Sequence, residues 1–149
     1  MRRSQRLQVV LEQSRRREQD ALNRLAAAQE RLQAQRTRLD ELERYHADYQ
    51  NQLREVGQGR LLVSRLQSLQ RFISQLALAI QQQQQAVTQF ERMLEEARRG
   101  WQEAHERRRG MERFIDECRR EEEHQIERKE QQHLDEAAMQ AFVRRQRDS

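Results

Sequence analysis

The sequence predicts an all-α protein: a long antiparallel two-helix coiled-coil hairpin with a C-terminal helical or frayed extension. The 149 residues include no proline, 36% are charged, 35% are hydrophobic and 5% are aromatic. That is little bulky apolar area for an ordinary globular core. The apolar residues recur with heptad spacing, whereas a disordered chain would scatter them. A pair of glycines interrupts this heptad pattern, which predicts two helices rather than one.

The first predicted helix covers residues 4–56. Its heptad a positions are Ser4, Leu11, Glu18, Leu25, Leu32, Leu39, His46 and Leu53. Its d positions are Leu7, Ser14, Ala21, Ala28, Gln35, Leu42, Tyr49 and Val56. Eleven of these sixteen residues are apolar, and the positions between them are mostly Arg, Gln and Glu. This narrow apolar stripe is typical of a coiled-coil seam, the line of a and d residues that faces the partner helix.

Gly57 and Gly59 predict the turn, over about residues 57–60, and a second helix follows over about 61–118. Its a positions are Leu66, Ile73, Ile80, Val87, Leu94, Trp101, Arg108 and Ile115. Its d positions are Leu62, Leu69, Leu76, Gln83, Phe90, Ala97, Ala104, Met111 and Cys118. Fifteen of these seventeen residues are apolar. A seam this strong requires a partner, and the nearest partner is the first helix folded back.

A tight turn centred between Gly57 and Gln58 predicts the register of the pair. In that register Leu53 faces Leu62, Tyr49 faces Leu66, Leu42 faces Ile73 and Leu25 faces Phe90. The pairing then ends where residue 1 lies opposite about residue 114. Residues 119–149 are therefore expected to extend beyond the hairpin as an unpaired segment.

That segment contains a weak apolar cluster of Leu134, Ala137, Ala138, Ala141 and Phe142. Two interpretations stay open. The cluster forms a short amphipathic helix that docks on another surface, or the segment is a fraying helical tail.

The sequence predicts no enzyme, no metal site and no cofactor. A two-helix hairpin offers no concave, water-excluding site, and His46, His105, His124 and His133 have no metal-ligand spacing with each other or with Cys118. The single cysteine fits a reducing compartment. No apolar run approaches the length of a membrane span, and the N-terminus lacks a signal-peptide pattern, so we expect a cytoplasmic protein without a transmembrane segment.

Two surfaces outside the seam are candidate interaction sites. Near the turn, Tyr45 and Phe72 both occupy g positions and are expected to be neighbours, with Ala79 also at g. The d residues Leu42, Tyr49 and Leu76 are expected beneath them. Such an exposed aromatic cluster favours protein binding, although the rings could simply lie along neighbouring side chains.

At the other end, arginines gather near the N-terminus, among them Arg2, Arg3 and Arg6. A basic end suits acidic protein loops, nucleic acid or anionic lipid. Nucleic acid is the weakest of these candidates, because no aromatics interleave with the arginines to stack on bases.

Three stretches closely resemble the flagellar FliJ family: "LERYHADYQNQL" (42–53), "LQSLQRFISQLALAIQQQ" (66–83) and "ARRGWQEAHERRRGME" (97–112). The similarity extends over essentially the full length. It implies a non-enzymatic stalk of the flagellar type III protein-export apparatus that couples the export ATPase hexamer to the export gate and escorts export chaperones. Such a component would be needed for flagellum assembly, motility and chemotaxis. The resemblance also implies a cytoplasmic location peripheral to the inner membrane at the flagellar basal body, reached through the export apparatus.

The resemblance also assigns sites. The contact with the cytoplasmic domain of the large gate subunit maps to Leu42, Tyr45, Tyr49, Phe72, Leu76 and Ala79. The ATPase-ring contact is assigned to Arg2, Arg3 and Arg6 at the other end of the hairpin, where the family has no tight motif to match. Two alternatives are kept: the equivalent stalk of a virulence type III secretion system, and a generic basic coiled coil that binds nucleic acid or a membrane surface.

Overall fold

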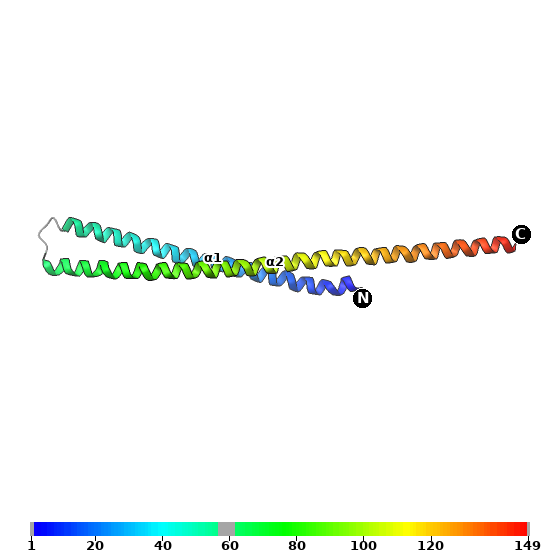
Figure 1. Ribbon diagram of the computed structural model, residues 1–149, viewed down its shortest axis with the longest axis horizontal. Helices are drawn as coiled ribbons and strands as arrows, with labels where there is room; N and C mark the ends of the chain where they lie inside the picture. The colour runs from blue at the N-terminus through cyan, green and yellow to red at the C-terminus, as the bar shows by residue number, and fades with distance from the viewer. Residues whose placement is uncertain (1, 57–61, 149) are drawn as a thin grey trace. The chain divides into compact units, whose positions relative to one another are not determined.

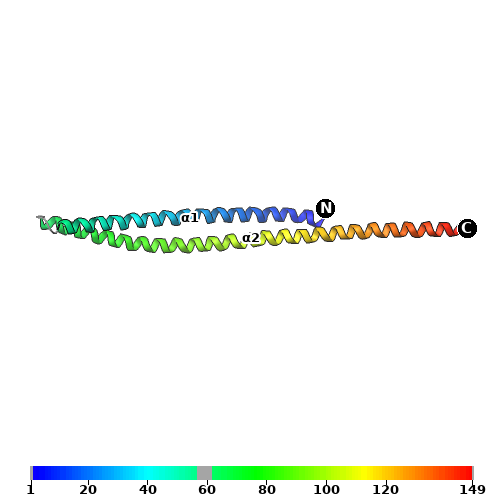
Figure 2. The same ribbon diagram turned by 90° about the horizontal axis from the view of Figure 1, so that it is seen from above.

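The computed structural model describes residues 2–56 and 62–148, and within them it contains two α-helices and no strand. Helix α1 spans Arg3–Val56 and helix α2 spans Val63–Arg147. The two long helices pack against each other, and both views show them antiparallel (Figures 1 and 2). The predicted all-α fold of two paired helices is confirmed.

The chain divides into two compact units, and each contains a stretch of both helices. The terminal unit comprises Met1–Glu18 and Ala104–Ser149, and the central unit comprises Gln19–Glu103. Gly57 and Gly59, for which a turn is predicted, lie outside the described residues.

Burial follows the heptads in both units. Along α1, the described a and d side chains from Ser4 to Leu53 are buried or half-buried, and the a and d side chains of α2 from Leu66 to Cys118 are as well. Most of the residues between them are exposed. Among the described residues the buried apolar core is small, and it consists of Leu11, Leu32, Val87, Ile115 and Cys118. The seam residues therefore hold the helices together, as the heptad pattern predicts.

The register in the central unit differs from the predicted one. Leu62, expected opposite Leu53, is 70% exposed and precedes α2. Gln83 contacts Gln35 rather than residue 32, and the ring of Phe72 contacts Tyr49, for which Leu66 was the expected partner. Relative to the predicted partners, the shift along α2 is six residues at Phe72, close to one heptad, and three residues at Gln83, whose contact lies between the two registers. Helix α1 ends at Val56 as predicted, and α2 begins at Val63 rather than at about residue 61.

In the terminal unit the start of α1 is tied to α2. The backbone N–H and the hydroxyl of Ser4 both donate to the carboxylate of Glu122, at 3.1 and 2.7 Å. Ser4 is only 4% exposed. Beyond this contact α2 continues to Arg147, and every described residue from Glu123 onward is exposed. Figures 1 and 2 both show this last part of α2 with no part of α1 beside it.

Candidate protein-interaction surfaces

The aromatic surface predicted near the turn lies in the central unit. Phe72 packs edge-on against Tyr49, with ring centroids 4.9 Å apart and planes at 80°. Edge-to-face pairs of this kind are favourable beyond the area they bury. The aromatic pair that the structure shows thus joins Phe72 to Tyr49, whereas the sequence placed Phe72 beside Tyr45. Phe72 is consequently fixed in position by α1.

The outer part of this surface is accessible. Tyr45 is 54% exposed and Phe72 is 41% exposed. Leu42, Leu76 and Ala79 are half-buried, as their positions on or beside the seam require. Exposed tyrosine and phenylalanine rings provide apolar contact area, and the phenol group of tyrosine can also form hydrogen bonds. That chemistry suits binding of another protein.

The predicted basic end lies in the terminal unit. Arg2, Arg3 and Arg6 are exposed. The guanidinium carbon of Arg3 lies 5.3 Å from the ring centroid of Phe114 in α2, a cation–π contact. The two hydrogen bonds from Ser4 lower the pKa of the Glu122 carboxyl below its usual value, because they stabilise the charged form. This end therefore offers positive charge on α1 directly beside an ionised carboxylate on α2.

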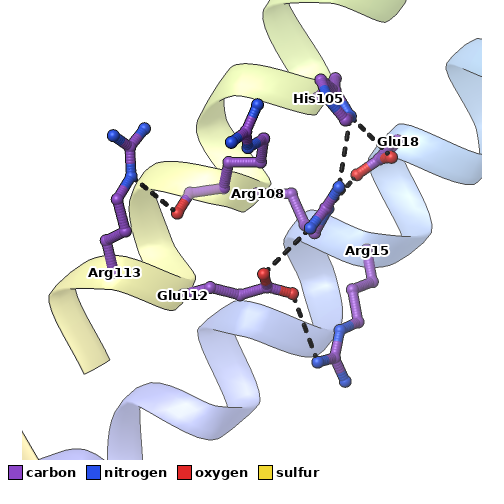
Figure 3. Close-up of polar contacts among 7 residues, drawn as sticks. Arg15, Glu18, His105, Arg108, Glu112 and Arg113 are labelled. Carbon is purple, nitrogen blue, oxygen red and sulfur yellow. Dashed lines mark hydrogen bonds and ion pairs between the residues drawn. The ribbon is translucent and has the colours of Figure 1, made fainter. Parts of the chain in front are cut away.

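A charged cluster crosses between the helices further along the terminal unit (Figure 3). Arg108 Nε donates a hydrogen bond to Glu18, and His105 Nδ1 lies 3.1 Å from the other oxygen of that carboxylate. Arg108 Nη1 also donates to Glu112 at 3.0 Å. The opposite oxygen of Glu112 is 3.5 Å from Arg15 Nη2. Two residues of α1 and three of α2 thus form one connected network.

The network shifts the ionisation of its central pair. The hydrogen bond from Arg108 lowers the pKa of Glu18, and contact with His105 adds to this effect while burial opposes it. The same hydrogen bond raises the pKa of Arg108. Both side chains are only about one-fifth exposed, at 20% and 22%, so this pair is more shielded from water than an ordinary surface ion pair. It joins the two helices across the seam.

Sequence reasoning missed this cluster because heptad positions alone do not say which residue of α1 lies opposite Arg108. The available signal was the placement of Glu18 and Arg108 at heptad a positions, where charged residues need partners. The spacing within α2 also placed Glu112 one turn from Arg108, which the structure shows as an ion pair. Only the register of the two helices identifies Glu18 as the partner across the seam.

Among the described residues, no group of three or more His, Cys, Asp or Glu side chains could hold a metal ion. In the same part of the chain, neither helix has a stretch apolar enough to cross a membrane. The two paired helices and the two exposed surfaces described above define the class of this molecule. It is an all-α coiled-coil protein with candidate protein-binding surfaces.

The family described as "Flagellar FliJ protein" matches residues 3–147. The chain belongs to this family. Membership makes it a component of a flagellar-type protein-export apparatus, and the family is structural rather than known for catalysis. Neither a search of curated proteins nor a search of solved structures finds a match to the chain.

Proposed function

We propose that this protein is the stalk that couples the export ATPase hexamer to the export gate of the flagellar apparatus. The observation that carries the proposal is the family match over residues 3–147. In this role the protein performs no chemistry. It acts cytoplasmically, peripheral to the inner membrane at the flagellar basal body, and it also escorts export chaperones.

The surface of Leu42, Tyr45, Tyr49, Phe72, Leu76 and Ala79 is the proposed contact with the cytoplasmic domain of the large gate subunit. Its support is chemical: Tyr45 is exposed, and Phe72 is held against Tyr49 with part of its ring accessible. Rigid aromatic residues lose little conformational entropy on binding and often carry most of the affinity of an interface.

The exposed arginines Arg2, Arg3 and Arg6 are the proposed contact with the ATPase ring. Their positive charge favours acidic loops of a partner. Arg3 is held over Phe114, so part of this charge is already fixed in place before any partner binds.

The gate contact is tested by measuring binding of the full chain to the immobilised gate cytoplasmic domain. The variants are Tyr45→Ala alone and Tyr45→Ala combined with Phe72→Ala. The matched control is Leu78→Ala, because Leu78 is 56% exposed in the same part of α2 but lies outside the surface. We expect about a tenfold or greater loss of affinity for the double variant, reduced swimming motility, and little change for the control.

Circular dichroism separates the possible results of this experiment. If the double variant loses its helicity, the two rings are structural and the proposed surface is wrong. If it stays folded and binds the gate domain as tightly as the wild type, the proposed contact is also wrong. A parallel assay with the ATPase uses Arg2→Glu, Arg3→Glu and Arg6→Glu together. The control with the same change in net charge is Arg24→Glu, Arg31→Glu and Arg92→Glu, at exposed positions of the central unit.

A further inference from the structure

We propose that residues 125–147 of α2 form a second antiparallel coiled coil with the same segment of another copy of this chain. This inference concerns self-association and does not depend on the proposed coupling role. It rests on the exposure of the segment and on the order of charges along one of its faces.

The segment is helical but exposed throughout. Leu134 is 65% exposed and Phe142 is 58% exposed, while Ile126, nearer α1, is 38% exposed. The contact between Ser4 and Glu122 is where α1 begins. A helix of this length in water owes most of its stability to packing, so its apolar residues favour a partner.

One face of this helix carries three kinds of side chain in order. Residues spaced three and four apart fall on the same side of a helix. Glu127 and Glu130 therefore share a face with Leu134, Ala138 and Ala141 at the middle, and the same face ends in Arg144 and Arg145. Among the described residues, none of the ion pairs that the structure shows involves these two glutamates or these two arginines. The face is acidic at one end, apolar in the middle and basic at the other end.

This order is complementary to itself when two copies run in opposite directions. Placing Leu134 of one copy against Ala138 of the other gives two equivalent central layers. The same register sets Glu127 against Arg145 and brings Glu130 beside Arg144 at the edge, each contact occurring twice. A parallel pair would place like charges against each other, so the charges favour the antiparallel arrangement.

The register also fits the available length of helix. The pairing runs from about residue 125, opposite residue 147 of the other copy, and thus stays within the exposed last part of α2. One contact is unfavourable, because Asp135 lies near the same residue of the second copy. Short length and this repulsion predict a weak dimer whose population depends on protein concentration.

The test is sedimentation equilibrium of the full chain over a range of concentrations, in low and high salt. We expect a reversible monomer–dimer equilibrium that salt weakens. Reversing charge at the acidic end (E127R with E130R) or at the basic end (R144E with R145E) should raise the dissociation constant about tenfold or more. An equimolar mixture of the two variants should restore association, because every reversed pair is again attractive. Asp135→Asn should strengthen the wild-type dimer.

Leu134→Asp is the variant that targets the apolar layer, and Val143→Asp is its matched control on the opposite face of the same helix. The first should abolish dimerisation and the second should leave it nearly unchanged. A wild-type chain that stays monomeric at all concentrations would overturn the proposal. Variants that dimerise as the wild type does, or a mixture that fails to restore association, would overturn it as well.

Discussion

The terminal and central units contain the same two helices and the same heptad pattern, but different polar groups cross their seams. In the terminal unit the crossing groups are charged: Glu18 meets Arg108 and His105, and Glu122 accepts hydrogen bonds from Ser4. In the central unit the part-buried polar contact at the seam is neutral, with Gln83 Nε2 donating to the backbone oxygen and side-chain oxygen of Gln35. The ion pair that crosses between the helices there, Arg36 with Glu91, has both side chains about half exposed.

The difference has a physical consequence. Charged contacts respond to pH and salt, while amide contacts hardly do. The terminal unit is therefore expected to be the condition-dependent part of the pair, and the central unit the constant part. Four changes test this contrast.

The largest effect is expected from shortening Ile115 in the terminal unit, where this side chain is 1% exposed. Ile115→Ala should lower the free energy of unfolding by about 2–5 kcal/mol, because a cavity is left in a thin core. The matched control is Ile126→Ala, since Ile126 is already 38% exposed. Hydrogen exchange should show the loss mainly at amides of the terminal unit, and a uniform loss in both units would contradict the contrast.

The second effect is a selective weakening of the terminal unit in acid. The pKa of Glu18 is lowered in the folded state, mainly by the hydrogen bond from Arg108. Its contribution to stability is complete above the unfolded value of 4.5 and is lost as the pH falls through the lowered folded value. Glu122 behaves with the same sign.

The measurement is hydrogen exchange or chemical denaturation at neutral pH and at pH values below 4.5. Glu18→Gln should destabilise the terminal unit at neutral pH and make little difference in acid. Glu30→Gln, at an exposed position of α1 in the central unit, is the control and should change neither. Equal acid sensitivity of wild type and Glu18→Gln would show that the charged cluster does not contribute.

A smaller effect is expected from replacing the amide pair of the central unit. Combining Gln35→Leu with Gln83→Leu should raise the free energy of unfolding by roughly 1 kcal/mol, because apolar side chains pack better in a seam. The same change should relax the register, since buried polar residues often fix it. Gln85→Leu, at an exposed position, serves as the control.

Relaxed register can be detected with cysteines introduced at Leu42 and Ile73. These positions face each other only in the register that is one heptad shorter. A cross-link that forms in the double leucine variant but not in the wild type supports the role of the glutamines. A cross-link in neither protein would show that other contacts define the register.

The smallest effects should come from the two glycines inside α2. A Cβ added at Gly100 or at Gly110 would meet no atom within 4 Å. Alanine at either position should therefore raise the free energy of unfolding by about 0.5–1 kcal/mol. Gly100 is in the central unit and Gly110 is in the terminal unit. Since neither added Cβ meets a neighbour, the two gains in stability should be equal, and thermal melting measures them. A loss at one position would indicate that its glycine has a packing role.

The candidate surfaces were partly accessible to sequence reasoning. The exposed position of Tyr45 followed from its place outside the a and d positions. The basic surface near the N-terminus followed from the number of arginines in that part of the sequence. The contact of Phe72 with Tyr49 and the cluster around Glu18 did not follow, because both depend on which turn of α2 lies opposite which turn of α1.

The sequence by itself determined that the chain forms two helices. It also determined which face of each helix packs against the other helix, because heptad spacing alone defines that face. It also predicted an unpaired extension over residues 119–149, and in the structure every described residue from Glu123 onward is exposed. Only the tertiary structure decided the register. A shift of one heptad leaves every apolar residue on the seam, so the pattern is nearly indifferent to it. The contacts of Glu18 with His105 and of Phe72 with Tyr49 select one register among equivalents.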